Sequence, residues 1–327
     1  MPSAGDVSRV AAVLDVGSHS VLLLTVALDA AGRARAVDEA LATTRLGAGL
    51  TPGGLLDAAA AARTCGAAAS FAGRARARAA TSVFAFATGA ARRAADGAEF
   101  ADTLAVLTGT PVEVLPGERE AALSYAAVTH GLDAGDGPVL AVDIGGATTE
   151  LTLGRGAVVE AAVSLPLGAL ALTEAHLASD PPGPEHIARL VDDVDAALAA
   201  AAVVTAARAS GARVIASGGT ATALAALDQR LETYQPKRVH GVTLDTDALA
   251  ALTDRLLVLP RAARADLGPL DPGRAAILPA GALVLDAIVR ASGAAAVQVS
   301  DHGVRHGYLR ERLAAAGVAA DLRWLWG

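Results

Sequence analysis

The amino-acid sequence predicts an α/β protein built from a duplicated domain. Residues 13–24 (VLDVGSHSVLLL) and 141–153 (AVDIGGATTELTL) share one order of residue types: an apolar strand, Asp, an apolar residue, Gly, a small polar turn and a second apolar or alternating run. Asp15 and Asp143 occupy equivalent positions in the two segments. Helical and strand patterns alternate after each segment, which is typical of sheets with parallel strands. The separation of the two segments is too long for a solenoid repeat and suits a duplicated domain.

Each copy of the repeated segment is predicted to form a β-hairpin. Gly17 and Gly145 supply the freedom to turn between two β-rich runs. A third strand is expected after each hairpin, at residues 33–43 in the first half and 157–164 in the second. The other expected strands lie at 81–87, 112–115, 213–217 and 296–300, and the expected helices at 53–72, 91–107, 117–130, 184–209, 218–227, 245–257, 272–291 and 303–315.

The composition bounds the class of protein. The 327 residues are enough for two domains. Hydrophobic residues make up 53% of the chain but aromatic residues only 3%, so we expect a core of Ala, Val and Leu with closely packed helices. The net charge of −7 argues against a general nucleic-acid binder, because such proteins are usually basic. An acidic enzyme can still hold a polyanion where arginines and a divalent cation gather.

The sequence predicts a cytoplasmic protein with no membrane partner. Cys65 is the single cysteine, so it forms neither an internal disulfide nor a zinc site, and a reducing compartment fits. The opening residues, MPSAGDVSRV, lack the pattern of a signal peptide. Apolar runs such as 275–285 are too short to span a bilayer. A homodimer is compatible with the sequence.

The two Asp-x-Gly turns are the first candidate sites. A glycine-containing hairpin exposes consecutive backbone N–H groups that suit phosphate oxygens, and an Asp at the strand end can hold a magnesium ion. A single turn of this kind is commonplace and indicates little, whereas equivalent copies indicate more. Hydroxyl donors follow at matching offsets: Ser18, Ser20, Thr148 and Thr149.

Glu150 lies seven positions after Asp143 on the return strand of the second hairpin. A hairpin of this length folds the glutamate back towards Asp143, so the two carboxylates could share a cation. The alternative is a glutamate that faces solvent on an alternating strand.

Two segments of the first half carry further candidates. Glu118 and Glu120 begin a helix, where acidic residues also favour the helix dipole without any catalytic role. Thr88 and Gly89 end a strand and begin a helix, an arrangement that binds anions. Arg92 follows, and it is either a phosphate clamp or an ordinary surface charge.

A glycine motif in the second half, Gly218-Gly219-Thr220, stands between a strand and a helix. It resembles a phosphate loop but matches neither the P-loop nor the dinucleotide fingerprint. Close packing of the helix on the strand is the alternative explanation. The histidines are scattered and indicate no zinc site. The motifs H-E-x-x-H and G-x-S-x-G and a kinase signature are absent from the sequence.

The order of these motifs resembles the exopolyphosphatase / guanosine-pentaphosphate phosphohydrolase family (Ppx/GppA). The resemblance covers nearly the whole chain and implies an actin-like ATPase fold with two ribonuclease-H-like domains and an interdomain cleft. It implies a first lobe at 1–125, a second at 126–303, and a C-terminal helix at 304–327 that packs back on the first. The matching segments are VLDVGSHSVLLL, TTRLGAGL, FAFATGAARRAA, LPGEREAALSY, VDIGGATTEL, VSLPLGALALTE, VIASGGTATALAAL, KRVHG and VSDHGVRHGYL.

The resemblance also implies roles for individual residues. Glu120 is expected to be the catalytic glutamate and Arg92 the arginine that clamps phosphate. Asp143, Glu150 and Asp15 are expected near a Mg²⁺ ion or another divalent cation. Phosphate binding is expected from the two turns and the glycine motif: Asp15, Gly17, Ser18, His19, Ser20, Thr88, Gly145, Gly146, Ala147, Thr148, Thr149, Gly218, Gly219 and Thr220.

The chain departs from the family pattern in several places. The family has Asn for His19, Ser for Gly89, Glu for Arg119, Gly for Ala147 and Arg for Ala122. A Cβ at Ala147 is expected to crowd a turn that needs a positive φ or a close phosphate. The chain also ends soon after the last shared motif, as in short members of the family.

The expected activity is release of the terminal phosphate from polyphosphate, guanosine pentaphosphate or both. A catalytically weak sensor of polyphosphate or the alarmone is the first alternative. An actin-like sugar kinase is the second, although no insertion for a sugar pocket is visible.

Overall fold

The chain folds into two compact units in the computed structural model, which describes residues 7–326. Unit 1 runs to Leu123 and resumes at Val304, and unit 2 comprises Ser124–Gly303. The sequence placed these two boundaries after residues 125 and 303. Helix α4 (Gly117–Gly131) carries the chain from the first unit into the second.

Unit 1 is built on a five-stranded sheet in the order β3-β2-β1-β4-β5. The repeated segment forms the expected hairpin, in which β1 and β2 are antiparallel and Asp15 lies opposite Leu22. β4 and β5 join parallel to β1 and to each other, through helical crossovers. The strands are β1 (Val7–Val16), β2 (Ser20–Asp29), β3 (Ala34–Thr43), β4 (Ser82–Ala87) and β5 (Val112–Val114).

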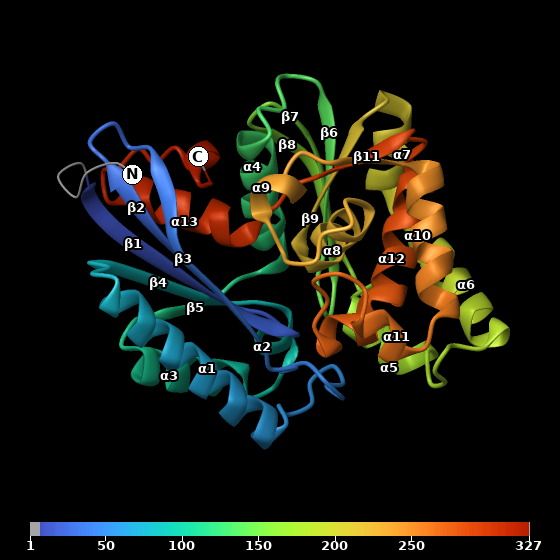
Figure 1. Ribbon diagram of the computed structural model, residues 1–327, viewed down its shortest axis with the longest axis horizontal. Helices are drawn as coiled ribbons and strands as arrows, with labels where there is room; N and C mark the ends of the chain where they lie inside the picture. The colour runs from blue at the N-terminus through green and yellow to red at the C-terminus, as the bar shows by residue number, and fades with distance from the viewer. Residues whose placement is uncertain (1–6, 327) are drawn as a thin grey trace. The chain divides into compact units, whose positions relative to one another are not determined.

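Helices cover both faces of the unit 1 sheet. α1 (Ala58–Ala77) and α3 (Gly97–Thr108) pack on one face over small side chains, and α13 (Val304–Ala315) lies along the other (Figure 1). Asp57 caps α1 by accepting a hydrogen bond from the Ala60 N–H. The unit also contains the short helix α2 (Gly89–Arg93) and a final 3₁₀ turn, η1 (Leu322–Trp324).

Unit 2 repeats this plan with a six-stranded sheet in the order β10-β11-β9-β6-β7-β8. β6 and β7 form the second hairpin, and β9 and β11 run parallel to β6. The strands are β6 (Pro138–Ile144), β7 (Thr149–Arg155), β8 (Val158–Leu165), β9 (Arg213–Ser217), β10 (Thr243–Asp245) and β11 (Ala296–Val299).

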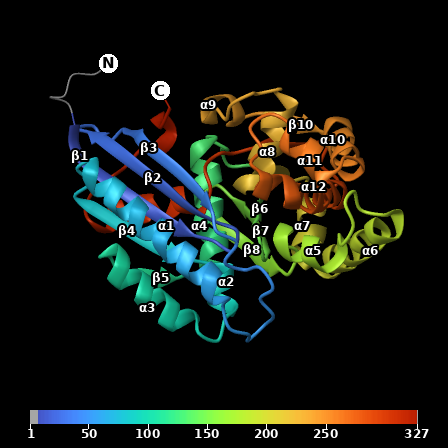
Figure 2. The same ribbon diagram turned by 60° about the horizontal axis from the view of Figure 1, so that its bottom comes forward.

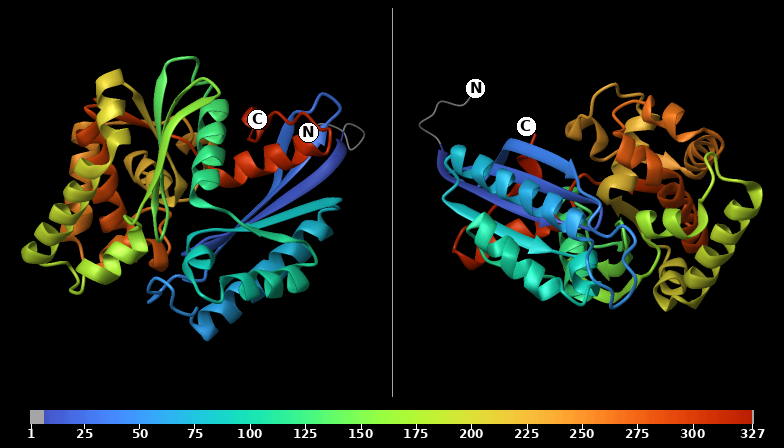
Figure 3. Two further views of the ribbon diagram at one scale, coloured as in Figure 1. Left: turned by 180° about the vertical axis from the view of Figure 1, so that it is seen from behind. Right: turned by 90° about the horizontal axis from the view of Figure 1, so that it is seen from below.

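One face of the unit 2 sheet packs on α4, and the other packs on the remaining large helices (Figure 3, left). α10, α11 and α12 lie side by side in this second layer (Figure 2). The helices after α4 are α5 (Ala169–His176), α6 (Pro184–Ala200), α7 (Ala202–Ser210), α8 (Gly218–Asp228), α9 (Pro236–Val239), α10 (Thr246–Val258), α11 (Arg261–Ala265) and α12 (Pro272–Ser292).

Two helices expected to be continuous are each broken in two. The expected helix 91–107 is interrupted before Gly97, where the chain turns so tightly that a Cβ would lie 1.8 Å from the Ala91 carbonyl oxygen. The expected helix 184–209 breaks at Ala201, whose ψ of 101° is extended. The Asp96-Gly97 pair at the first break is a turn signal in the sequence. The alanine-rich sequence around Ala201 favours helix, so only the second break reflects tertiary packing. The sequence analysis did not anticipate α5, α9, β10 or α11.

Helix α12 is the one helix among residues 7–326 that is long and apolar enough to cross a membrane. In the structure 78% of its most apolar stretch is buried inside unit 2, as in the central helix of a globular core. The helix packs there against α5, α6, α7, α8, α10 and α11.

Candidate phosphate-binding and catalytic site

The first repeated turn, residues 15–20, is a tight bend between β1 and β2. The Gly17 N–H donates to the Ser20 carbonyl oxygen at 2.9 Å and closes the turn. Asp15, Ser18 and His19 are buried here, with at most 8% of their surface exposed. Such burial of polar residues in a strand-to-strand bend is typical of a binding site rather than of an ordinary surface turn.

The second repeated turn, residues 143–149, closes in the same way. The Gly145 N–H donates to the Thr148 carbonyl oxygen, again at 2.9 Å. A Cβ at Gly17 would lie 3.2 Å from the Ser20 oxygen, and one at Gly145 would lie 3.1 Å from the Thr148 oxygen. The two bends therefore have the same closure and the same steric demand at their first glycine.

The hydroxyl of Thr149 does not face the bend as expected. Its Oγ1 donates to the Leu167 carbonyl oxygen at 2.8 Å, and the residue is fully buried. Thr149 alternates with Glu150 along β7, so the two side chains leave opposite faces of the sheet. The Thr149 hydroxyl thus already donates its hydrogen bond inside unit 2. Any contact of this residue with phosphate would have to come from its backbone N–H.

A row of polar side chains crosses unit 2 at the second bend. Asp143 lies directly opposite Glu150 in the antiparallel pair, and Glu150 lies opposite Ser164. Asp143 is also in register with Ser217 of the parallel neighbour. Directly opposed residues share a face, so one polar residue from each of four adjacent strands points to the α4 side of the sheet. The Ser164 hydroxyl donates to Glu150 at 2.8 Å.

The Asp143 carboxyl is surrounded by protein. Burial raises its pKa, and hydrogen bonds from Ser124 and Ser217 oppose that effect. The Ser124 hydroxyl donates to Oδ2 at 3.0 Å. Gly218 packs against the other side with a φ of +81°, and a Cβ there would lie 2.6 Å from Oδ1. Glycine is therefore required at position 218 both for its conformation and for space beside the carboxylate.

In unit 1, Glu120 and Arg92, which the sequence marked separately, form an ion pair. Arg92 Nη1 lies 2.6 Å from Glu120 Oε2 and also donates to the Leu115 carbonyl oxygen at 2.9 Å. The two side chains keep 22% and 12% of their surface exposed. Thr88, which precedes the short helix α2 that carries Arg92, is buried, and its N–H donates to the Val16 carbonyl oxygen. Arg92 is therefore held beside Glu120 rather than extended into solvent.

The glycine motif contributes backbone rather than side-chain groups. Thr220 is fully buried, and its Oγ1 has no hydrogen-bond partner among residues 7–326. A Cβ at Gly281 of α12 would lie 2.5 Å from that oxygen, so the Thr220 side chain faces α12. Any anion contact by Thr220 would therefore have to come through its N–H group.

Arg274 is a candidate that the sequence analysis missed. Its guanidinium lies over Gly219, where a Cβ would be 2.1 Å from Nη2. Burial lowers the pKa of Arg274, with Asp271 and Tyr234 acting in the opposite direction. An arginine distant in sequence gave no signal, because only the fold brings α12 to the glycine motif.

The donor set of unit 2 fits a magnesium ion. Asp143 and Glu150 place two carboxylates on one face, and magnesium is usually held by one or two carboxylates with waters and substrate phosphates. A cation there would also offset the burial that raises the pKa of Asp143. No cluster of three or more His, Cys, Asp or Glu suited to a metal occurs among residues 7–326. Asp15 belongs to unit 1, and its role beside the cation stays a prediction.

The departures Ala147 and Arg119 have structural explanations. Ala147 is buried but is not among the non-glycine residues with a positive φ, so the expected backbone strain is absent. Arg119 Nη2 lies 2.6 Å from Glu311, and its Nε lies 3.2 Å from Glu113. Arginine at position 119 thus bridges α4 and α13 within unit 1 instead of joining the site.

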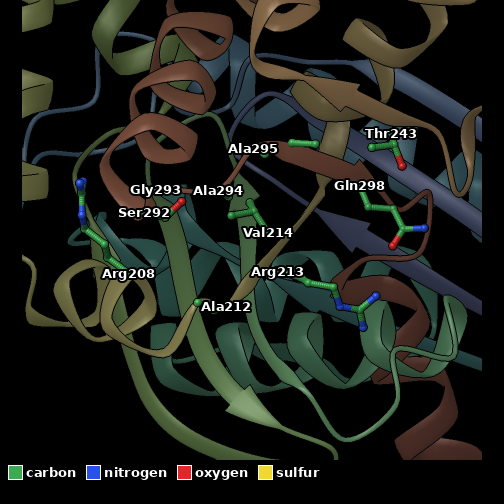
Figure 4. Close-up of a pocket in the computed structure, with 12 residues that line it drawn as sticks. Arg208, Ala212, Arg213, Val214, Thr243, Ser292, Gly293, Ala294, Ala295 and Gln298 are labelled. Carbon is green, nitrogen blue, oxygen red and sulfur yellow. The ribbon is translucent and has the colours of Figure 1, made fainter.

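A pocket of about 680 Å³ lies elsewhere in unit 2 (Figure 4). Arg213 and Gln298 line it at the start of β9 and in β11, together with Arg208 and Thr243. Asp143, Ser217 and Gly218 lie at the opposite, carboxyl end of these parallel strands. Because ligands of open α/β sheets bind at the carboxyl ends of strands, this pocket is separate from the site.

The duplicated sheets and paired glycine bends define a two-unit α/β protein with the actin-like ATPase fold. A sequence model of the Ppx/GppA phosphatase family matches residues 25–316, and the chain belongs to that family.

Named relatives and solved structures agree with this assignment. Exopolyphosphatase 1 of Mycobacterium tuberculosis is 32% identical over 301 residues, covering 92% of this chain and 87% of the relative. Exopolyphosphatase 2 of the same organism is 34% identical over 317 residues, covering 92% and 97%. The crystal structure of the Aquifex aeolicus family member is 28% identical with a TM-score of 0.78, covering 94% of this chain and 98% of that one.

Proposed function

We propose that the chain is an exopolyphosphatase that hydrolyses the terminal phosphoanhydride bond of inorganic polyphosphate, and that it accepts guanosine pentaphosphate as a second substrate. Family membership and the named exopolyphosphatase relatives support phosphohydrolase chemistry. The observation that carries the proposal is the direct opposition of Asp143 and Glu150 beside a glycine bend. That arrangement combines a place for a divalent cation with backbone donors for phosphate oxygens.

Unit 2 would bind the phosphates and the cation. The N–H groups of the second bend donate to phosphate oxygens, and Arg274 adds a planar positive group beside Gly219. Asp143 and Glu150 would hold a magnesium ion, and this ion would neutralise charge on the phosphate oxygens during reaction. Ser124 and Ser217 fix the Asp143 carboxylate by hydrogen bonds, while Ser164 fixes Glu150.

Unit 1 would supply the proton transfer. Glu120 accepts a proton from a water molecule as the water oxygen bonds to the terminal phosphorus. The bridging P–O bond breaks, and its electron pair leaves on the shortened chain. Arg92 holds the Glu120 carboxylate before substrate arrives and donates to the transferred phosphoryl group during the reaction. The first bend contributes further backbone donors.

Replacing Glu120 with Gln tests the proposed base. The variant should release phosphate from a short polyphosphate with magnesium at least about 10³-fold more slowly, because the amide cannot take the proton. Glu118→Gln is the matched control, since Glu118 is an exposed acid in the same helical turn. We expect the control to stay within about threefold of the parent. An E120Q variant as active as E118Q would refute the role.

The same assay separates the alternative functions. Phosphate release from both polyphosphate and guanosine pentaphosphate would support the full proposal, and release from one alone would limit it to that substrate. A rise in melting temperature with ligand but without phosphate release would instead support a polyphosphate or alarmone sensor.

A further inference from the structure

Each bend is contacted from outside by a Leu–Gly segment. Leu46-Gly47 follows strand β3 in unit 1, and Leu167-Gly168 follows strand β8 in unit 2. Both leucines are buried in the core of their own unit. We call these two segments the first brace (44–47) and the second brace (167–171).

The first brace binds two carbonyl groups of the first bend. The Gly47 N–H donates to the Ser18 carbonyl oxygen at 2.8 Å. The N–H groups of Thr44 and Arg45 both donate to the His19 carbonyl oxygen, at 3.0 and 2.8 Å. Two consecutive peptide groups of the bend are thereby fixed by backbone alone.

The second brace, at the start of α5, binds two consecutive carbonyl groups of the second bend. The Ala169 N–H donates to the Gly145 carbonyl oxygen at 2.9 Å. Those of Leu170 and Ala171 both donate to the Gly146 carbonyl oxygen, at 2.9 and 3.0 Å. The brace is itself tied down, because the Leu167 carbonyl oxygen accepts the buried Thr149 hydroxyl.

These hydrogen bonds decide where the amide protons of the bends point. A trans peptide group is planar, with its C=O and N–H directed oppositely. The carbonyl of the third residue after the repeated aspartate, Ser18 or Gly146, points at its brace. The N–H of the next residue, His19 or Ala147, must then point away from the brace. His19 and Ala147 both depart from the family's usual residue. The proposed donor at each position is the backbone N–H, which remains in place whatever the side chain is.

Close approach of each brace depends on its glycine. A Cβ at Gly168 would lie 2.1 Å from the Ala147 carbonyl carbon, and one at Gly47 would lie 2.9 Å from Ser18 Cβ. Gly168 has an ordinary extended conformation, with φ −79° and ψ 140°. Space, and not backbone freedom, is therefore what requires glycine at position 168.

We propose that Gly168 and Gly47 are positioning residues for catalysis. They let the braces lock the Gly145, Gly146 and Ser18 carbonyls and so aim the next amides, those of Gly146, Ala147 and His19, at substrate phosphates. This inference rests on the proposed function of the two bends. Preorganised backbone donors of this kind need no reorganisation when charge develops.

Alanine substitutions test the inference. Gly168→Ala should lower kcat for phosphate release by about 100-fold, similar to the loss of one preorganised donor. Gly47→Ala should lower kcat by about 10-fold, because a Cβ there would lie 2.9 Å from Ser18 Cβ, a milder overlap than the 2.1 Å approach at Gly168. Gly137→Ala and Gly66→Ala are matched controls, since a Cβ at either site meets nothing within 4 Å. A G168A protein that melts like G137A and keeps parental kcat would overturn the proposal.

A second variant guards against misfolding of G168A. Ala169→Pro removes only the N–H that bonds Gly145, at the first position of α5 where proline is tolerated and after a residue already in the extended conformation. We expect a tenfold lower kcat, at about the cost of one hydrogen bond, with the circular dichroism spectrum unchanged. Unchanged kcat in folded A169P would contradict the inference.

A measurement independent of turnover separates this inference from the proposed function. In ¹⁵N-labelled parent protein, tripolyphosphate with magnesium should shift the amide resonances of Ala147 and His19, and the Ala147 shift should be lost in G168A. If the parent releases no phosphate but shows these shifts, the proposed hydrolase activity is refuted, while the proposed positioning of the amides by the braces is supported. If the parent releases phosphate and neither amide responds, the braces fail while the hydrolase stands.

Discussion

The two bends share a backbone and differ in the residue opposite the repeated aspartate. Asp15 faces Leu22 across its hairpin, whereas Asp143 faces Glu150. Leu22 and Glu150 stand at the same offset from their aspartates, so the difference is one of chemistry and not of register. The supports differ as well, since a loop braces the first bend and a helix start braces the second.

This difference indicates a division of labour between two copies of one motif. A glycine bend with braced carbonyls is sufficient to present N–H groups to an anion. A second carboxylate is needed to hold a divalent cation as well, and only the second bend has one opposite its aspartate. In the proposed function, the duplication thus supplies two turns that bind anions, and one of them is also the candidate cation site.

Among the changes that compare the two bends, the largest effect should come from removing the carboxylate that distinguishes them. Glu150→Gln should lower phosphate release by at least about 100-fold at millimolar magnesium, since a neutral amide binds the cation poorly. Leu22→Gln, the matched change in the first bend, should alter the rate less than about fivefold. Magnesium titrations of both variants with short polyphosphate provide the measurement. Equal losses in the two variants would abolish the distinction between the bends.

A smaller effect is expected when the departures at equivalent positions are reversed. His19→Asn and Ala147→Gly each restore the family residue, but the braces already orient the backbone N–H there. We expect kcat to change less than about threefold in either variant. Ala147→Gly should also lower stability by about 0.5–1 kcal/mol, because glycine loses more entropy on folding. A gain of tenfold or more in kcat would show that the side chains, and not the amides, limit the reaction.

The smallest effect concerns how the stability of the protein depends on pH, through a buried histidine of unit 2. His240 accepts from the Asp301 N–H through Nδ1 at 3.2 Å and contacts the Gly131 carbonyl oxygen through Nε2 at 3.2 Å. Burial lowers the pKa of His240 below its usual 6.5, and the Gly131 hydrogen bond opposes that effect. The folded state therefore binds this proton less readily than the unfolded state, and stability falls as pH drops below about 6.5.

Thermal unfolding of the parent and of His240→Gln checks this expectation. The parent should lose about 2 °C more than the variant between pH 7.5 and 5.5. His186→Gln serves as the control, because His186 lies at the start of α6 in the same unit, with 24% of its side chain exposed. Identical pH profiles for the parent and H240Q would show that His240 does not contribute.

Local patterns predicted the hairpins, and the hairpins in turn predicted the Asp143–Glu150 pair. A strand period of two residues and a glycine turn are sufficient to place those carboxylates on one face. The pairing of Arg92 with Glu120 also brought together two residues that the sequence had marked separately. In each case the signal lies in residues close together in the chain or in motifs of known order.

Features that depend on distant segments were not predictable in this way. Arg274 reaches Gly219 only because α12 packs beside α8. The braces act through backbone N–H groups, so their two glycine-containing segments can be seen in the sequence but their contacts with the bends cannot. Thr149 was expected to bind phosphate, but its hydroxyl donates a hydrogen bond to the buried Leu167 carbonyl oxygen. The metal role of Asp15, the cytoplasmic location and the homodimer stay predictions.

Helix α12 has a consequence for the life of the chain before it is folded. It would be apolar enough to enter a lipid bilayer if unit 2 did not enclose it, and strand β11 of the enclosing sheet is synthesised after it. A nascent or heat-unfolded chain therefore exposes an apolar segment of about 20 residues, which can bind chaperones, membranes or other copies of the chain. The unfolded chain should accordingly precipitate on heating at high protein concentration, and refolding yields should improve with dilution or mild detergent.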